Sequence, residues 1–235
     1  MDSVKHWIQT HWVVQSDTKQ LANAVYEELY AAYLQGVDRM IIPGGQSVHA
    51  LYQQLEQHVH KMPNCKFRLS DERIVKPEET DSNEGQIQRG YPTLYQQLLS
   101  HHAVDANKIE QFLSKEYVAV IGAGNDGHFA SLFPTDTSFA ENELLHSYQK
   151  PGDTFIRQSF GYPVFLHASK VFLWMPGIAK ATNAHAFKNS DTSIPLFRLW
   201  SDLNRQNKTL KVYTDESCFE AFQSMIEQDV TSDSI

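Results

Sequence analysis

The sequence is poor in cysteine and has no surplus of basic residues. Its 235 residues include two cysteines, Cys65 and Cys218, which lie far apart in the chain. This argues against a disulfide scaffold and against a zinc site built from cysteine thiolates. Lys and Arg number 20 against 28 for Asp and Glu, which gives a formal net charge of −8. Because nucleic acids are bound mainly through basic side chains that face the phosphates, no nucleic-acid partner is expected.

Long hydrophobic runs are also absent. A typical one, residues 171–176, has about six residues, whereas a membrane-spanning helix needs about 18 or more. The first residues, 1–7, contain no apolar segment of the kind that a signal peptide has. We therefore predict a cytoplasmic protein with no membrane partner. With 41% hydrophobic residues, the chain can still bury a substantial core.

The hydrophobic pattern predicts alternating strands and helices. Apolar residues recur at helical spacing from Leu21 to Tyr33, with Ser16 or Asp17 as the N-cap and Gly36 as the stop. Two further helices are expected, at 48–60 and 216–228. Short apolar runs predict five strands, at 40–43, 67–70, 117–121, 170–174 and 210–213. Residues 71–91 have the composition of a long polar loop.

This alternation predicts a three-layer α/β/α fold of the Rossmann-like kind, with a mainly parallel central sheet. The chain, 1–235, is expected to form a single domain. In such sheets, ligands bind beyond the carboxyl ends of the strands. Three polar or glycine-rich segments follow predicted strands: Gly44–Gly45, Asp71–Arg73 and Gly122–His128.

The segment 122–128 reads Gly-Ala-Gly-Asn-Asp-Gly-His and is expected to open a helix that runs through Leu132. It matches the G-x-G-x-x-G dinucleotide fingerprint, but no second strand ending in an acidic residue follows it. A tight turn would explain the glycines alone, but not Asp126 and His128, which lie two positions apart. Because a histidine can take up a proton near neutral pH, His128 is the candidate general base.

Other polar segments have weaker signals. In Gly44–Ser47, backbone N–H groups between a strand and a helix suit a phosphate or carboxylate. The sequence Asp71-Glu72-Arg73 fits either a surface ion pair or an arginine held ready for an anion. The histidines at 58/60 and 101/102 lack nearby acids or cysteines, so solvated helix ends are expected there and no metal site is predicted.

Together, these segments resemble the 6-phosphogluconolactonase family, part of a larger group that includes glucosamine-6-phosphate isomerase/deaminase. The matching residues span roughly 38–220 and are Gly44–Gly45, Asp71-Glu72-Arg73, Asp81-Ser82-Asn83, Gly122-x-Gly-x-Asp-Gly-His-x-Ala-Ser-Leu-Phe-Pro134, Arg157 and Gly177-x-x-Lys180. The resemblance implies hydrolysis of the δ-lactone of 6-phosphogluconate, in the pentose phosphate pathway, without a metal or organic cofactor. The expected partner is a small sugar phosphate, and a monomer is expected, with a dimer as the alternative.

The resemblance also implies roles for particular residues. His128 aligns with the general base that activates a water, and Asp126 would orient it or bind sugar hydroxyls. Arg73 would hold the substrate or donate to the oxyanion. The candidate residues for substrate or phosphate binding are Gly44, Gly45, Ser47, Asp71, Asn83, Arg157 and Lys180.

Two departures from the family pattern keep alternatives open. Gln46-Ser47 stands where the family usually has Ser-Thr, and the segment 102–116 is short for a parallel crossover. If 109–113 is a strand, a family helix is missing or reduced there. A non-catalytic sugar-phosphate sensor is therefore one alternative. A glucosamine-6-phosphate isomerase/deaminase is a second, although 129–134 lacks the acid of that branch, and a dinucleotide oxidoreductase is a third.

Overall fold

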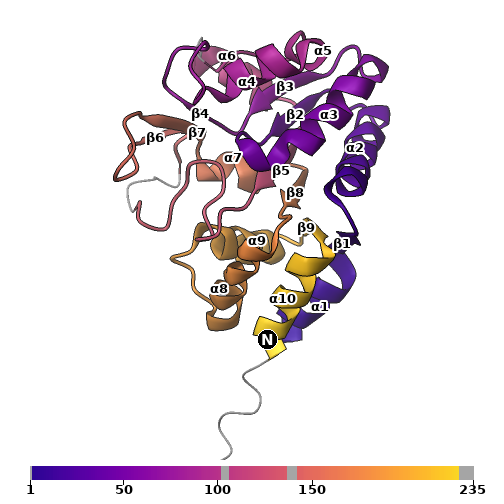
Figure 1. Cartoon of the computed structure of the whole chain (residues 1–235), viewed down its shortest axis with the longest axis vertical. Helices are drawn as coiled ribbons and strands as arrows, with labels where there is room; N and C mark the ends of the chain where they lie inside the picture. The colour runs from indigo at the N-terminus through magenta and orange to yellow at the C-terminus, as the bar shows by residue number, and fades with distance from the viewer. Residues whose placement is uncertain (1, 102–105, 137–141, 228–235) are drawn as a thin grey trace, which may run out of the picture.

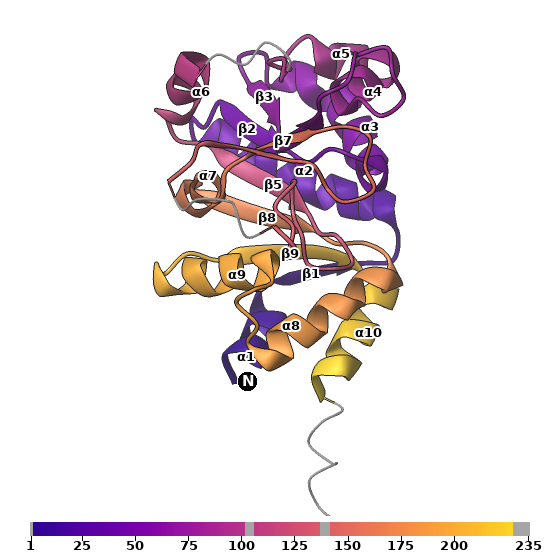
Figure 2. The same ribbon diagram turned by 90° about the vertical axis from the view of Figure 1, so that its left-hand side faces the viewer.

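The computed structural model describes residues 2–101, 106–136 and 142–227 (Figure 1). Six parallel strands form the main sheet, in the order β1-β9-β8-β5-β2-β3, and Figure 2 shows them stacked in this order. Their bounds are β1 Trp12–Gln15, β2 Arg39–Ile42, β3 Lys66–Leu69, β5 Val118–Gly122, β8 Lys170–Trp174 and β9 Leu210–Asp215. The five strands predicted from the sequence are confirmed, and β1 is an addition at one edge.

Helices cover both faces of this sheet, which confirms the three-layer α/β/α prediction. One face packs against α2 Thr18–Leu34, α3 His49–His58, α4 Asn83–Gly90 and α5 Pro92–Tyr95. The other packs against α1 Asp2–His11, α6 Ala106–Leu113, α7 Tyr162–His167, α8 Ala184–Asn189, α9 Pro195–Arg205 and α10 Glu216–Glu227. Neighbouring strand residues alternate between the two faces: Met40 and Ile42 join the first core and Ile41 joins the second.

A second, antiparallel sheet is built from β4 Asp71–Arg73, β7 Arg157–Phe160 and β6 Leu145–Tyr148, in the order β4-β7-β6. The prediction of a long loop over 71–91 is therefore wrong. The strand β4 pairs with a segment more than eighty residues away, and such a partner leaves no local pattern in the sequence. Within the same stretch, α4 begins after Ser82, whose hydroxyl accepts a hydrogen bond from Gly85 N at 2.9 Å.

The predicted helix ends can be compared with the structure. Asp17, rather than Ser16, caps α2, because its carboxylate accepts from Gln20 N at 2.8 Å. Gly36 follows that helix with φ +97°, a conformation that favours glycine. The short helices η1 Gln46–Val48 and η2 Val59–Lys61 flank α3. The helix predicted at 216–228 is α10, and residue 228 lies outside the described residues.

The alternative of a strand at 109–113 is wrong. These residues belong to α6, and Ile109 and Phe112, three positions apart, are both buried against the sheet. The crossover from β3 to β5 therefore contains the helices α4, α5 and α6. Residues 102–105 lie outside the described part, and a family helix missing from this region stays a prediction. Among the described helices, none is both long and apolar enough to cross a membrane.

The order of the strands determines where a ligand can bind. The chain passes from β2 outward to its neighbour β3, returns to β5 on the other side of β2, and continues to β8 and β9. The connections after β2 and β5 therefore leave in opposite directions. Such a switch point leaves a crevice beyond the carboxyl ends of the two strands.

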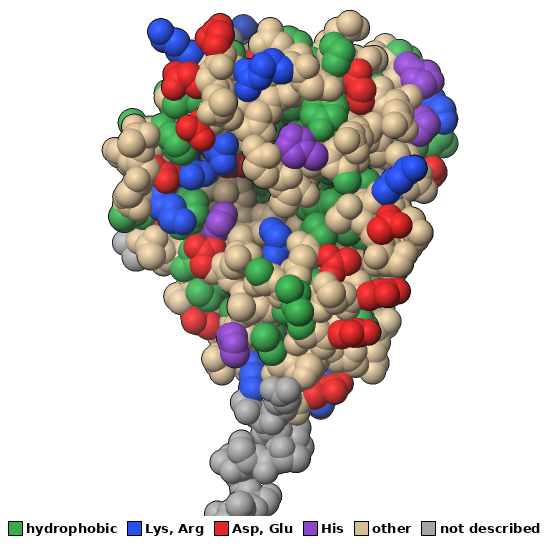
Figure 3. Space-filling view, in the orientation of Figure 1, with side chains coloured by type: hydrophobic (Ala, Val, Ile, Leu, Met, Phe, Trp, Pro, Cys, Tyr) green, Lys and Arg blue, Asp and Glu red, His purple; other side chains and the backbone are tan. Residues whose placement is uncertain are grey.

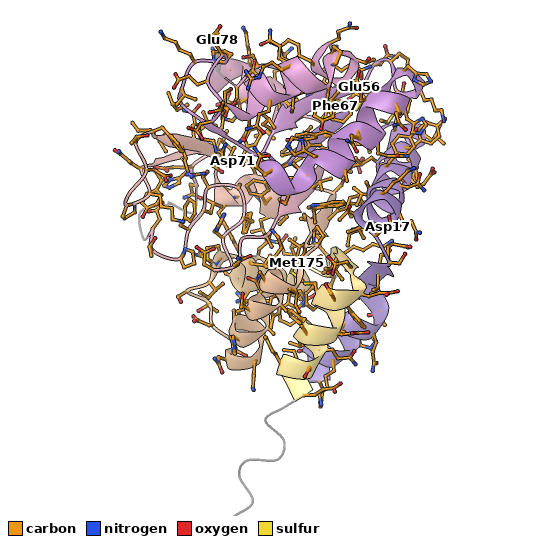
Figure 4. The ribbon with its side chains drawn as sticks, viewed as in Figure 1. Asp17, Glu56, Phe67, Asp71, Glu78 and Met175 are labelled. Carbon is orange, nitrogen blue, oxygen red and sulfur yellow. The ribbon has the colours of Figure 1, made fainter. Side chains whose placement is uncertain are left out.

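Glu56 on α3 gives a test of how α5 is attached (Figure 4). Its carboxylate accepts hydrogen bonds from Thr93 N at 3.0 Å and Leu94 N at 2.8 Å, at the start of α5. Burial raises the pKa of Glu56, but the bonds from Thr93 and Leu94 outweigh it and hold the pKa below 4.5. We expect Glu56→Gln to lower the free energy of unfolding at pH 7 by about 1 kcal/mol, measured by urea denaturation.

The pH dependence of this loss follows from the sign of the shift. A carboxyl whose pKa is lowered in the folded state stabilises the protein above its unfolded pKa, and the stabilisation is lost as the pH falls. The gap between wild type and Glu56→Gln should therefore close as the pH drops below the unfolded value of 4.5. The exposed Glu78 gives the control variant Glu78→Gln, and an equal loss in both variants would contradict the assignment.

Candidate active site

The carboxyl ends of β2 and β5 border a cleft with a volume of about 500 Å³. Figure 3 shows a hollow on one face of the molecule, with Lys, Arg and His side chains around it. All the residues selected from the sequence line this cleft: Gly44, Gly45, Ser47, Asp71, Arg73, Asn83, Asp126, His128, Arg157 and Lys180. The fold thus brings them together, and the roles that the resemblance implies for them stay predictions.

The loop after β5 carries Asp126 and His128. It is irregular, so the prediction of a helix opening through Leu132 is wrong. Gly124 N donates to His128 O at 2.8 Å, and Ala130 adopts a left-handed φ of 49°, which prevents a helix from starting. A Cβ on Gly124 would overlap the imidazole of His128, so this glycine gives the ring its space.

The side chains of Asp126 and His128 form a hydrogen-bonded pair. The hydrogen bond from His128 to Asp126 Oδ1 is the main cause that lowers the pKa of Asp126, to about 2. The carboxylate is therefore ionised and can only accept, so in the neutral imidazole the proton lies on Nδ1. The lone pair of Nε2 is then left to accept a proton, as a general base requires.

The ring of Phe133 lies beside this pair and links it to the basic residues. Its centroid is 4.4 Å from that of His128. Lys150 Nζ lies 4.9 Å from the centroid of the Phe133 ring, and the guanidinium of Arg157 lies 5.6 Å from it. A cation over an aromatic face is attracted by the ring quadrupole. Phe133 therefore holds two cations near the imidazole.

Arg73 joins the same group of cations through a second ring. The guanidinium groups of Arg73 and Arg157 lie 5.9 Å and 5.1 Å from the centroid of Phe155. Arg157 Nε donates to Asp153 at 2.7 Å, and Arg73 Nη1 donates to Asp81 O at 2.7 Å. Each guanidinium thus uses one fixed bond for orientation. The Nε of Arg73 is buried, so the Nη groups of Arg73 and Arg157 are the donors left for an anion.

Lys150 was missed by the sequence reasoning. It lies in the connection between β6 and β7, and no motif precedes it. The strand β6 pairs with the nearby β7, whereas β7 also pairs with the distant β4. The place of Lys150 at the cleft becomes visible only when β7 pairs with β4 and turns this segment toward the carboxyl ends of the main sheet.

Lys180 has different surroundings. Its ammonium donates to Ala123 O, at the root of the loop that carries His128. Burial is the main cause that lowers the pKa of the Lys180 ammonium. The basic side chains of the cleft are therefore divided into a cluster of Arg73, Lys150 and Arg157 on the aromatic rings and a separate lysine that is bonded to the backbone.

The acidic pair Asp71 and Glu72 is buried and structural in its contacts. Glu72 is fully buried and accepts from the N–H groups of Asn83 at 2.8 Å and Glu84 at 2.6 Å, so it caps α4. Asp71, labelled in Figure 4, lines the cleft and accepts from Ser131 Oγ at 2.9 Å. The surface ion pair considered from the sequence is therefore wrong for these two carboxylates.

Asn83 connects this region to the glycine segment after β2. Its Oδ1 accepts from Gly45 N at 3.1 Å, and its amide lies where a Cβ on Gly44 would otherwise be. The N–H of Gly45 thus already has a partner in this structure. The carbonyl of Ser47 accepts from Trp174 Nε1 at 2.9 Å, which ties the segment to β8.

The competing histidines have separate places. His101 is buried rather than solvated and lies edge-on to Phe160, so the expectation of a solvated helix end is wrong for it. His102 lies outside the described residues. His60 is exposed and His58 is partly buried against Tyr26. In the described part of the chain, no three His, Cys, Asp or Glu side chains come together as a metal site.

A parallel sheet with an Asp–His pair and a group of cations at its switch point defines a class of α/β proteins suited to proton transfer on a small anion. The family model described as glucosamine-6-phosphate isomerases/6-phosphogluconolactonase matches residues 15–209. The chain belongs to this glucosamine-6-phosphate isomerase/6-phosphogluconolactonase family.

Individual relatives agree with this assignment. A 6-phosphogluconolactonase of Helicobacter pylori is 28% identical over 192 residues, which cover 72% of this chain and 80% of that protein. One of Pseudomonas putida is 35% identical over 127 residues, covering 48% and 52%.

Solved structures share the fold. A 6-phosphogluconolactonase from Leishmania guyanensis has a TM-score of 0.72 at 17% identity and covers 89% of this chain and 97% of its own. A monomeric glucosamine-6-phosphate deaminase has a TM-score of 0.68 at 12% identity, with coverage of 90% and 100%.

The division of the cations predicts where an anion binds. We expect Arg157→Leu to weaken the binding of inorganic phosphate by about tenfold or more, because a charge-assisted hydrogen bond is lost. Lys180→Met should have a smaller effect, since the ammonium of Lys180 is bonded to Ala123 O. Calorimetric titration measures both. The exposed Lys61 provides a charge-matched control, Lys61→Met, and a loss for Lys180→Met as large as that for Arg157→Leu would contradict the division.

Proposed function

We propose that this protein hydrolyses 6-phospho-D-glucono-1,5-lactone to 6-phosphogluconate, a step of the pentose phosphate pathway. The observation that carries the proposal is the Asp126–His128 pair in one cleft with the basic cluster of Arg73, Lys150 and Arg157. The family membership and the curated relatives named 6-phosphogluconolactonase support it. A cytoplasmic location and a monomeric state belong to the same proposal.

The pair supplies the base for the attack on the lactone. Nε2 of His128 takes a proton from a water as the water oxygen forms a bond to the lactone carbonyl carbon. The Asp126 carboxylate stabilises the imidazolium that results. When the tetrahedral oxyanion collapses, the bond from this carbon to the ring oxygen breaks, and the imidazolium returns the proton to that oxygen. General-base assistance of this kind accelerates a reaction about 10²–10⁴-fold.

The basic cluster holds the phosphate in this scheme. Arg73, Lys150 and Arg157 come from β4, the β6–β7 connection and β7, and they line the cleft together around the rings of Phe133 and Phe155. The lactone carbonyl then lies toward His128. We assign Asp71, as an acceptor, and Asn83, as a donor, to the sugar hydroxyls, because both line the cleft.

Two alternatives receive less support. Gln46, which motivates a non-catalytic sensor, has its side chain bonded to His49 Nε2 at 2.9 Å and does not line the cleft, so it does not disturb the Asp126–His128 pair. The monomeric glucosamine-6-phosphate deaminase has the same fold, but the segment 129–134 that follows His128 contains no acid. Release of ammonia from glucosamine 6-phosphate would favour that activity.

The proposal is tested by following the hydrolysis of freshly generated 6-phosphogluconolactone with purified protein. Wild type should exceed the spontaneous rate by a wide margin. His128→Ala should reduce kcat by about 10²–10⁴-fold, because the water loses its base. Turnover of the wild type that cannot be distinguished from spontaneous hydrolysis would reject the proposal.

A pair of glycine variants tests the geometry without removing a functional group. Gly124→Ala puts a methyl group where the imidazole of His128 lies, so kcat should fall by about 100-fold or more. Gly122→Ala is the matched control, because its Cβ would make only an ordinary contact of 3.6 Å with Pro43. Both variants are assayed for lactone hydrolysis. Equal activities of the two variants would mean that catalysis does not depend on the present position of the His128 imidazole.

A further inference from the structure

A short 3₁₀ helix, η3 Ile178–Asn183, contacts the loop that carries His128 through three side chains. These side chains donate to three consecutive carbonyl groups: Lys180 to Ala123 O, Asn183 Nδ2 to Gly124 O at 2.9 Å, and Thr182 Oγ1 to Asn125 O at 2.6 Å. The loop therefore has a side-chain partner at each of the three residues that precede Asp126.

Asn183 is built into this contact. It is 3% exposed, and its Nδ2 also donates to Lys180 O at 2.8 Å, so one amide bridges η3 and the loop. Two carbonyl acceptors can only be satisfied by the NH₂ end, which fixes the orientation of the amide. Its Oδ1 is buried, has no hydrogen-bond partner among the described residues, and faces Gly127, where a Cβ would lie 3.1 Å away. The side chain of Asn183 thus lies against the loop both before Asp126, at Gly124, and after it, at Gly127.

Thr182 makes a second contact of the same kind. Its hydroxyl lies within hydrogen-bond distance of Asn125 O and, at 2.9 Å, of Ala179 O. Because Thr182 is exposed, this contact does not contribute to the hydrophobic core. What it fixes is the peptide that leads directly into Asp126.

We propose that Thr182 and Asn183 are positioning residues, which hold the loop 123–125 so that Asp126 keeps the imidazole of His128 in its productive orientation. They touch neither the cleft nor the ring, since neither of them lines the cleft. The inference rests on the proposed function for its catalytic consequence. The contact of Thr182 and Asn183 with the loop 123–125, called the clamp below, can be measured separately from catalysis.

Kinetics give the first test. Asn183→Leu keeps much of the volume and removes the donor, and it should lower kcat for lactone hydrolysis about 10–100-fold, as expected for a displaced catalytic group. KM should stay within about threefold, because the phosphate cluster is untouched. Thr182→Val should lower kcat about 3–10-fold through the loss of one hydrogen bond. Thr182→Ser keeps the hydroxyl and should recover most of that loss.

Hydrogen exchange of the segment 122–130, followed by mass spectrometry, gives a second test that needs no activity. Exchange should become faster in Asn183→Leu and Thr182→Val than in wild type, and it should return toward wild type in Thr182→Ser. His185→Ala is the control, because His185 is exposed on the following helix α8 and has no hydrogen bond to the loop in the described structure.

The outcomes separate the two proposals. An inactive wild type overturns the proposed function, and the exchange rates alone then show whether Thr182 and Asn183 hold the loop. An active wild type with unchanged kcat and unchanged exchange in both variants overturns the clamp. A loss that Thr182→Ser does not recover, or that raises KM as much as it lowers kcat, also overturns it. Lower kcat with faster loop exchange and recovery by serine supports it.

Discussion

The parallel pairing of β2 with β5 is the contact on which the site depends. Met40 pairs with Val118 and Ile41 with Ala119, and all four side chains are fully buried. This pairing places the carboxyl ends of two strands side by side although they are about eighty residues apart in the sequence. Because the chain leaves the two strands in opposite directions, the glycine segment after β2 and the histidine loop after β5 face each other across a cleft.

The second sheet gives this cleft its positive charge. The chain as a whole has a net charge of −8, yet the Lys, Arg, Asp and Glu side chains that line the cleft are four basic residues and two acidic ones: Arg73, Lys150, Arg157 and Lys180, with Asp71 and Asp126. Glu72 is withdrawn from the cleft, because it is buried on the N–H groups at the start of α4, and Asp153 accepts from Arg157 without lining the cleft. A locally basic pocket in an acidic protein suits a small anion and not a polyanion, whose affinity depends on a broad basic surface.

How much of this could be predicted depends on whether the signal is local. Buried strands and the pair Asp126–His128 are local, since a run of apolar residues or a two-residue spacing is visible in the sequence. The strand Asp71–Arg73 and the place of Lys150 at the cleft are not, because both depend on the pairing of β4 with the distant β7. The helix expected after His128 does not form, because Ala130 adopts a left-handed conformation that cannot be predicted from the residue types around it. In the sequence, Thr182 and Asn183 cannot be distinguished from other polar residues. Their hydrogen bonds to the loop carbonyls appear only in the structure.

These features combine into an account in which the two ends of the substrate are recognised by different parts of the fold. In the proposed binding mode, the phosphate binds to cations from the antiparallel sheet, and the reacting carbon lies at the loop from the parallel sheet. A crystal structure with bound 6-phosphogluconate tests this most directly. We expect the phosphate on Arg73, Lys150 and Arg157 and the carboxylate of the product within hydrogen-bond distance of His128 Nε2. A phosphate bound at His128, or a product that lies outside the cleft, would contradict it.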